Sequence, residues 1–171
     1  DLSVGEVMER AGSERTIFYR HFDDLGDLLL RAGRESIEAL YATEIDLGAS
    51  RDGSGTRPGA IRDAIRPVVA FYEHHGALLR ALEEAAVSDE RIAAGQQALR
   101  ERFDDLAATA LGELPQLASV PKDEMREIAH ALNLMNVSYL LDAFGREHRI
   151  SAEQAVQTLT AIWTGLIFGP R

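Results

Sequence analysis

The sequence contains no cysteine among its 171 residues. Disulfides, thiolate catalysis and cysteine-ligated zinc sites are therefore excluded, and the composition fits a reducing compartment. No apolar run is long enough to span a bilayer, and no secretory signal is visible. We therefore expect a cytoplasmic protein that makes no membrane contact. Because the chain begins with Asp1 and not Met, we also expect further residues upstream.

Positive charge is scarce. The chain has 18 lysines and arginines against 28 acidic residues, a net charge of −10. This excess opposes general binding to phosphate backbones, so any contact with nucleic acid must be local. Residues 1–22 follow the same trend, with three arginines and four acidic residues.

Catalytic motifs are also lacking. The sequence has no HExxH, no GxSxG and no P-loop. Glu73, His74 and His75 are adjacent and do not share a helix face. The other candidate side chains are interpreted as solvated helix charges or isolated histidines: Glu83, Glu84, Asp104, Asp105, His130 and His148. We expect no enzyme activity, no cofactor and no metal site.

Apolar residues recur at helical spacing along most of the chain, and no β pattern is present, so the sequence predicts an all-α fold. Pro67 predicts a kink or break near Arg66. Residues 48–59 are rich in glycine and predict a flexible segment. The expected helices cover residues 4–11, 14–22, 25–45, 58–75, 77–87, 89–111, 122–144 and 152–168. We expect two domains, residues 1–45 and 46–171.

The N-terminal segment has the signals of two short helices joined by a turn. Ser3 and Glu6 form a capping-box pattern, and Gly12 is a typical helix stop. Ser13 is expected to cap the second helix, and Phe18 and Phe22, one turn apart, are expected to face inward. Two short helices in this arrangement outline a helix-turn-helix.

The residues AGSERTIFYRHF (11–22) resemble the DNA-binding motif of the TetR family of bacterial transcription regulators. The matching positions are Ala11, Gly12, Tyr19, His21 and Phe22, followed by a Leu-Leu pair at 28–29. The resemblance implies a helix-turn-helix head whose first helix is missing from this chain, followed by a helical body for ligand binding and dimerisation.

The resemblance implies that Tyr19 and His21 contact phosphates, although the end of a small packed helical head is the alternative for both. Arg15 and Thr16 lie nearest the start of the second helix, where an arginine is expected to pair with guanine in the major groove or with phosphate. Ile17 departs from the family pattern, which has a small polar residue there, and Asp23 and Asp24 should repel DNA. The DNA-binding candidates are Ser13, Arg15, Thr16, Tyr19, Arg20 and His21.

Residues 127–136 (EIAHALNLMN) and 161–169 (AIWTGLIFG) resemble the last two helices of a TetR-family repressor that has a long apolar ligand tunnel. The resemblance places Asn133, Asn136 and Trp163 in such a tunnel, although an asparagine bonded within its own core is the alternative. The full set of candidate ligand-binding residues is Val69, Phe71, Tyr72, Leu79, Phe103, Leu106, Asn133, Met135, Asn136, Tyr139 and Trp163. A few amides in an apolar site suit a lipophilic molecule with one carbonyl or ester.

The family likeness implies a homodimer formed by the last two helices. Apolar positions all around both helices fit that role. The resulting hypothesis is a repressor that binds a double-stranded DNA operator and is released by a small apolar effector. A DNA-incompetent helical binder of lipophilic molecules is the alternative, motivated by Ile17, Asp23 and Asp24. An enzyme has no residue set behind it.

Overall fold

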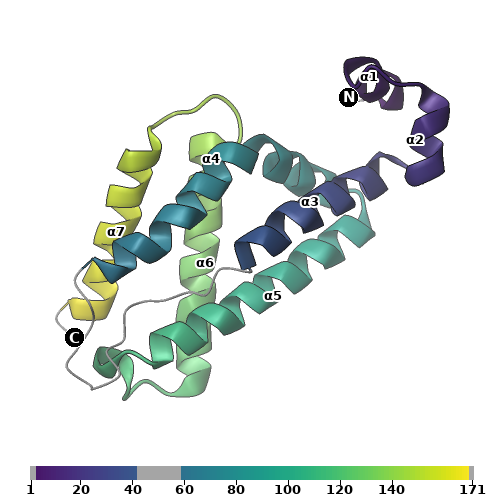
Figure 1. The fold of residues 1–171 in the computed structure, drawn as a ribbon. Coiled ribbons are helices and arrows are strands. Elements are labelled where there is room, and N and C mark those ends of the chain that lie inside the picture. The colour runs from purple at the N-terminus through teal and green to yellow at the C-terminus, as the bar shows by residue number, and fades with distance from the viewer. Residues whose placement is uncertain (1–2, 42–58, 170–171) are drawn as a thin grey trace.

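The structure, a computed structural model, describes residues 3–41 and 59–169. Every regular element in these two ranges is helical, which confirms the all-α fold class (Figure 1). The elements are α1 (Val4–Arg10), α2 (Arg15–His21), α3 (Leu25–Tyr41), α4 (Ala60–Ala86), α5 (Glu90–Gly112), the short 3₁₀ helix η1 (Pro115–Leu117), α6 (Lys122–Phe144) and α7 (Ala152–Phe168). No helix in the described part of the chain is long and apolar enough to cross a membrane. The segment predicted to be flexible, 48–59, lies outside the described residues except for Gly59.

The capping signals at the N-terminus give the expected start and stop of α1. The Ser3 Oγ accepts from the Glu6 backbone N–H, and the Glu6 carboxylate accepts from the Ser3 backbone N–H at 2.8 Å. Gly12 has φ +62°, the left-handed conformation that ends a helix at low steric cost. The predicted cap at Ser13 is wrong. Its N–H donates to Met8 O and closes the turn, and the N-cap of α2 is Glu14.

Helix α4 is continuous through two positions at which the sequence predicts an interruption. Pro67 lies inside the helix, and the predicted gap between residues 75 and 77 is absent. Ile61, Ile65 and Val69 are buried on both sides of the proline. Their packing overrides the local cost of the missing N–H, so the helix does not break at Pro67, and a kink there stays a prediction.

Gly76 is a contact point between helices instead of a helix stop. A Cβ at this position would lie 2.7 Å from the Phe144 carbonyl carbon, and closer still to the Phe144 carbonyl oxygen. No side chain fits there without moving α4 away from α6. The glycine therefore allows the two backbones to approach.

The body consists of α4 to α7, with α3 laid across it. Helix α5 contacts α6, α4 contacts both α6 and α7, and α3 contacts α4 and α5 (Figure 1). A second, smaller apolar cluster joins α3 to this body. It contains the buried Leu79, Leu82, Ile92 and Leu141, against which Leu29, Leu30 and Ile37 of α3 pack.

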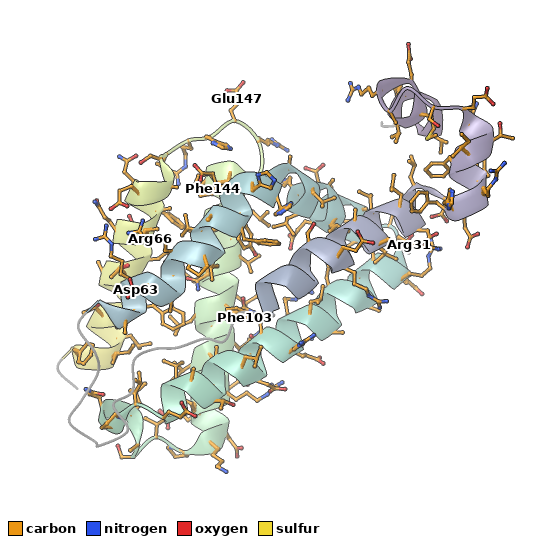
Figure 2. All side chains as sticks on the ribbon, viewed as in Figure 1. Arg31, Asp63, Arg66, Phe103, Phe144 and Glu147 are labelled. Atoms are coloured by element: carbon orange, nitrogen blue, oxygen red, sulfur yellow. The ribbon has the colours of Figure 1, made fainter. Side chains whose placement is uncertain are left out.

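Helices α1 and α2 pack on each other and project from the body at the start of α3 (Figure 1). Arg31, labelled on α3 in Figure 2, lies over the Phe22 ring with its Cζ 5.4 Å from the ring centroid. Arg91 at the start of α5 donates to the Asp24 carboxylate at 2.9 Å. The head is thus held to the body through the first turns of α3.

Candidate DNA-reading surface and ligand cavity

Helix α2 separates an inward aromatic side from an exposed polar side. Phe18 is buried, and its ring lies 5.3 Å from that of Phe22, as the spacing predicts. Tyr19 packs edge-on against Phe18 while 57% of its surface stays exposed. The Tyr19 ring is therefore held by Phe18 on one side and exposed to solvent elsewhere.

The other DNA-binding candidates lie around the same helix. Arg15, Thr16, Arg20 and His21 are exposed, and Ser13 in the preceding turn is half-buried. The structure brings five of the six candidates together on one seven-residue helix. Their side chains offer two guanidinium groups, two hydroxyls and an imidazole, which are groups that bond phosphates and base edges.

The residues that depart from the family pattern are exposed beside this surface. Ile17 is 40% exposed, and Asp23 and Asp24 are exposed just after α2. Asp24 also accepts from the Asp27 backbone N–H at 2.8 Å and so caps α3. Asp24 thus has a structural task where the head meets the body.

A cavity of about 100 Å³ lies between α3, α4, α5 and α6. A smaller cavity of about 30 Å³ continues toward α7, and the two share Val68, Phe103 and Asn136. Figure 2 places Phe103 in the middle of the body. The larger cavity is lined by Ile37, Val68, Phe71, Tyr72, Leu79, Glu83, Gln96, Leu99, Arg100, Phe103, Asn133, Asn136, Val137 and Leu141.

Seven of the eleven ligand-binding candidates line these two cavities: Phe71, Tyr72, Leu79, Phe103, Asn133, Asn136 and Trp163. The other four lie elsewhere. Val69 is fully buried in the core, and Met135 and Tyr139 are half-buried against it. Leu106 on α5 is 38% exposed and lines neither cavity.

Two buried asparagines, one turn apart on α6, are among the polar residues of the cavity lining, together with Tyr72, Glu83, Gln96 and Arg100. The Asn133 Nδ2 donates to Asp104 Oδ1 at 2.9 Å. The Trp163 Nε1 donates to Asn136 Oδ1 at 3.4 Å. Each amide therefore uses one of its ends within the protein, and both residues line the larger cavity.

Asp104 was missed by the sequence analysis, which interprets it as a solvated charge. It is only 2% exposed and bonds both Asn133 and His130, whose Nδ1 lies 2.7 Å from Asp104 Oδ2. The neighbouring Asp105 does behave as expected, since it is exposed and pairs with Arg126 at 3.0 Å. A signal was present in the spacing, because Asp104 lies three and seven residues before the buried Ala107 and Leu111.

A larger hollow of about 590 Å³ lies at the other end of α5, against η1 and the start of α6. None of the ligand-binding candidates lines it. Among residues 3–41 and 59–169, no group of three metal-ligating side chains is placed to hold an ion.

The outer faces of α6 and α7 expose large apolar side chains. Leu134, Ile162, Leu166 and Phe168 are between 38% and 48% exposed. The opposite side of α7 is buried through Leu159, Trp163 and Ile167. Both helices are therefore apolar on more than the side that faces their own body.

The family model described as "Transcriptional regulator EthR, C-terminal domain" matches residues 61–169, more than half of the chain. The chain belongs to the EthR family of TetR-type transcriptional regulators. A search among curated proteins found no match. The EthR domain begins at the second residue of α4 and ends just after α7, so it includes most of the cavity lining. Helices α1 and α2 lie outside the matched range.

Proposed function

We propose that this EthR-family regulator is a DNA-binding repressor that a small lipophilic effector releases from its operator. The observation that carries the proposal is one chain with two features. It has a solvent-facing polar side on α2, backed by the buried Phe18, and a body of the EthR type with an amide-bearing apolar cavity. We place this activity in the cytoplasm, where the DNA is accessible.

The exposed side of α2 is proposed to enter a DNA groove. Arg15, Thr16 and Arg20 would contact bases or phosphates, with Tyr19 and His21 on the backbone. Ser13 is proposed to approach DNA with its side chain, because its backbone N–H is already bonded to Met8. The net charge of −10 opposes approach to the phosphate backbone, so we expect weak operator binding that depends on the local arginine contacts.

The cavity is proposed to receive the effector, with Asn133, Asn136 and Trp163 as its polar contacts. Its volume of about 100 Å³ is below the roughly 300–1,000 Å³ of pockets for drug-sized ligands. A longer lipophilic molecule therefore enters only when neighbouring side chains move apart. Met135, Tyr139, Leu106 and Val69 line neither cavity, and we keep them as candidates only for a form that a larger ligand opens.

Effector binding is proposed to reach the head through α3. Ile37 of α3 and Leu79 of α4 both line the cavity. Gly33 lies so close to α4 that a Cβ there would be 2.6 Å from Leu82 Cδ1. Displacing Ile37 and Leu79 would therefore shift α3, and a coupling of about 1–3 kcal/mol is enough to regulate.

The partner across α6 and α7 is proposed to be a second copy of the chain. Leu134, Ile162, Leu166 and Phe168 provide the exposed apolar surface. A twofold dimer presents its two heads to half-sites about one DNA turn apart, roughly 34–36 Å.

The test is fluorescence anisotropy with the full-length protein and labelled DNA from upstream of its own gene, at low salt. We expect saturable binding that unlabelled upstream DNA removes at lower concentration than unrelated DNA does. Equal competition by the two DNAs would refute the proposal. Ile17, Asp23 and Asp24, exposed beside the DNA-reading side, favour a second candidate, a lipophile binder without DNA affinity, which an absence of binding would select.

A further inference from the structure

The hydrogen bonds around the cavity determine which end of each asparagine amide faces it. Asp104, on α5, is almost fully buried. Its two carboxylate oxygens bond Asn133 and His130, both on α6. A carboxylate accepts hydrogen bonds and has none to donate. Turning the Asn133 carbonyl toward it would place two acceptors within 2.9 Å of each other, which is repulsive.

Asp104 therefore holds the Nδ2 of Asn133 and leaves its Oδ1 for the cavity. That oxygen has no hydrogen-bond partner among the described residues. Asn133 as a residue is 5% exposed, and its oxygen lines the cavity. A ligand that carries a donor beside Asn133 can therefore bond this oxygen, whereas a ligand with only acceptors cannot.

The opposite orientation holds one turn later on the same helix. The indole N–H of Trp163 is a donor only, so it fixes the Oδ1 of Asn136 toward α7. The Nδ2 of Asn136 has no partner among the described residues and remains able to donate. Residues three apart on a helix are neighbours, so the cavity presents an acceptor and a donor side by side.

We propose that Asp104 is a positioning residue that makes the cavity selective for uncharged carboxamides and lactams over esters. This inference rests on the proposed ligand-binding function and names the chemical class of its effector. A primary carboxamide or a lactam carries an N–H and a C=O on one edge, which complements Asn133 and Asn136 together. An ester satisfies Asn136 and leaves the Asn133 oxygen facing another oxygen.

The test compares two probes with the same number of non-hydrogen atoms, octanamide and methyl heptanoate. The dissociation constant of each is measured by ligand-observed NMR on the full-length protein and on the variant Asp104→Leu. The apolar side chain removes the acceptor behind Asn133, whose amide is then free to turn its donor to the cavity. We expect the ratio of octanamide affinity to methyl heptanoate affinity to fall about tenfold. Comparing ratios cancels the different hydration of the probes.

Asp105→Leu is the matched control, because it removes the adjacent but exposed carboxylate. It should leave the ratio unchanged. Asn133→Leu is a second variant, which removes the cavity acceptor while Asp104 keeps its bond to His130, and it should lower the ratio as Asp104→Leu does. Circular dichroism verifies that each variant keeps its helices.

A ratio that stays within about twofold in both Asp104→Leu and Asn133→Leu overturns the inference. So does a failure of octanamide to bind the unmodified protein. Binding of both probes without a change in ratio leaves the ligand chamber standing and removes only the role of Asp104. The DNA titration described above tests the proposed function separately.

Discussion

The guanidinium of Arg91, the second residue of α5, lies 2.9 Å from the carboxylate of Asp24, which caps the N-terminus of α3. Arg91 also bonds Asp89 at 2.8 Å, so one side chain joins two caps. Gly26 lies beside this group and leaves room for it, whereas the Cβ of any other residue would lie 2.8 Å from Asp89 Oδ2. This joint ties the start of α5 to the start of α3, the helix that follows the head.

The variant Arg91→Gln should loosen the joint without unfolding the protein. Exposed ion pairs contribute little to global stability, so the melting temperature should hardly change. Hydrogen exchange of the amides in residues 23–28 should increase severalfold. Local opening of this segment costs less free energy when it no longer has to break the hydrogen bond between Asp24 and Arg91. Mass-spectrometric hydrogen exchange measures this, with amides of α6 as an internal reference. Arg149→Gln, which breaks the equally exposed pair with Asp142 at 2.8 Å, should leave residues 23–28 unchanged.

The same joint predicts a dependence of stability on acid. The hydrogen bond from Arg91 lowers the pKa of Asp89 from 3.8 to about 2. The pKa of Asp24 is also lowered, first by the Asp27 backbone N–H and then by Arg91. A carboxylate with a lowered pKa stabilises the fold above its ordinary pKa and loses this effect as the pH falls through the lowered value.

Urea unfolding at a series of pH values tests this prediction. Between about pH 4 and pH 2 the unmodified protein should lose slightly more unfolding free energy than Arg91→Gln, because the variant lacks the part of the lowered pKa that Arg91 causes. The difference should be small because the pair is exposed, and the Asp27 N–H still lowers the pKa of Asp24 in the variant. All other carboxylates titrate in both proteins, so the difference isolates the joint. Parallel pH curves for the two proteins would contradict this interpretation.

Gly76→Ala should be strongly destabilising. The added Cβ meets the backbone of Phe144 at 2.7 Å or less, and backbone cannot rotate away as a side chain can. Overpacking of this kind typically costs about 1–3 kcal/mol. Gly112→Ala is the control, because nothing lies within 4 Å of its Cβ position and alanine favours helix. Thermal unfolding should show a clear loss for Gly76→Ala and none for Gly112→Ala; similar melting temperatures would refute the close contact of α4 and α6.

Leu166→Glu tests the dimer. A charge on the outer face of α7 should oppose burial against a second copy, so sedimentation velocity should show a shift from dimer to monomer at micromolar concentration. Val87→Glu places the same charge on another apolar position, 89% exposed at the end of α4, and should leave the dimer intact. If the unmodified protein already sediments as a monomer, the dimer proposal fails.

Local signals in the sequence predict the ends of helices well. Helices α6 and α7 coincide with the predicted ranges, and α7 begins with the capping box of Ser151 and Gln154. Caps and turns depend on residues within a few positions of one another, so their physics is readable from the sequence. Pro67 and Gly76 mislead for the converse reason: their neighbours on α6 and α7 decide the outcome, and these are far away in sequence.

The cavity shows the same division. The family resemblance predicts Asn133 and Asn136 at a ligand site, and both line the cavity of the structure. Their orientation was not predictable, because it depends on Asp104 and Trp163, which belong to other helices. A periodicity argument assigns a side chain to a face, whereas a hydrogen bond between helices requires their relative placement.

The exposed side of α2 is tested most directly by Arg15→Ala. In the full-length protein, titrated by anisotropy against its upstream DNA at fixed low salt, this variant should bind about tenfold or more weakly. Arg146→Ala, which removes an exposed arginine just after α6, should bind as the unmodified protein does. Equal losses in the two variants, or none in Arg15→Ala, would contradict the assignment of α2 as the DNA-reading helix.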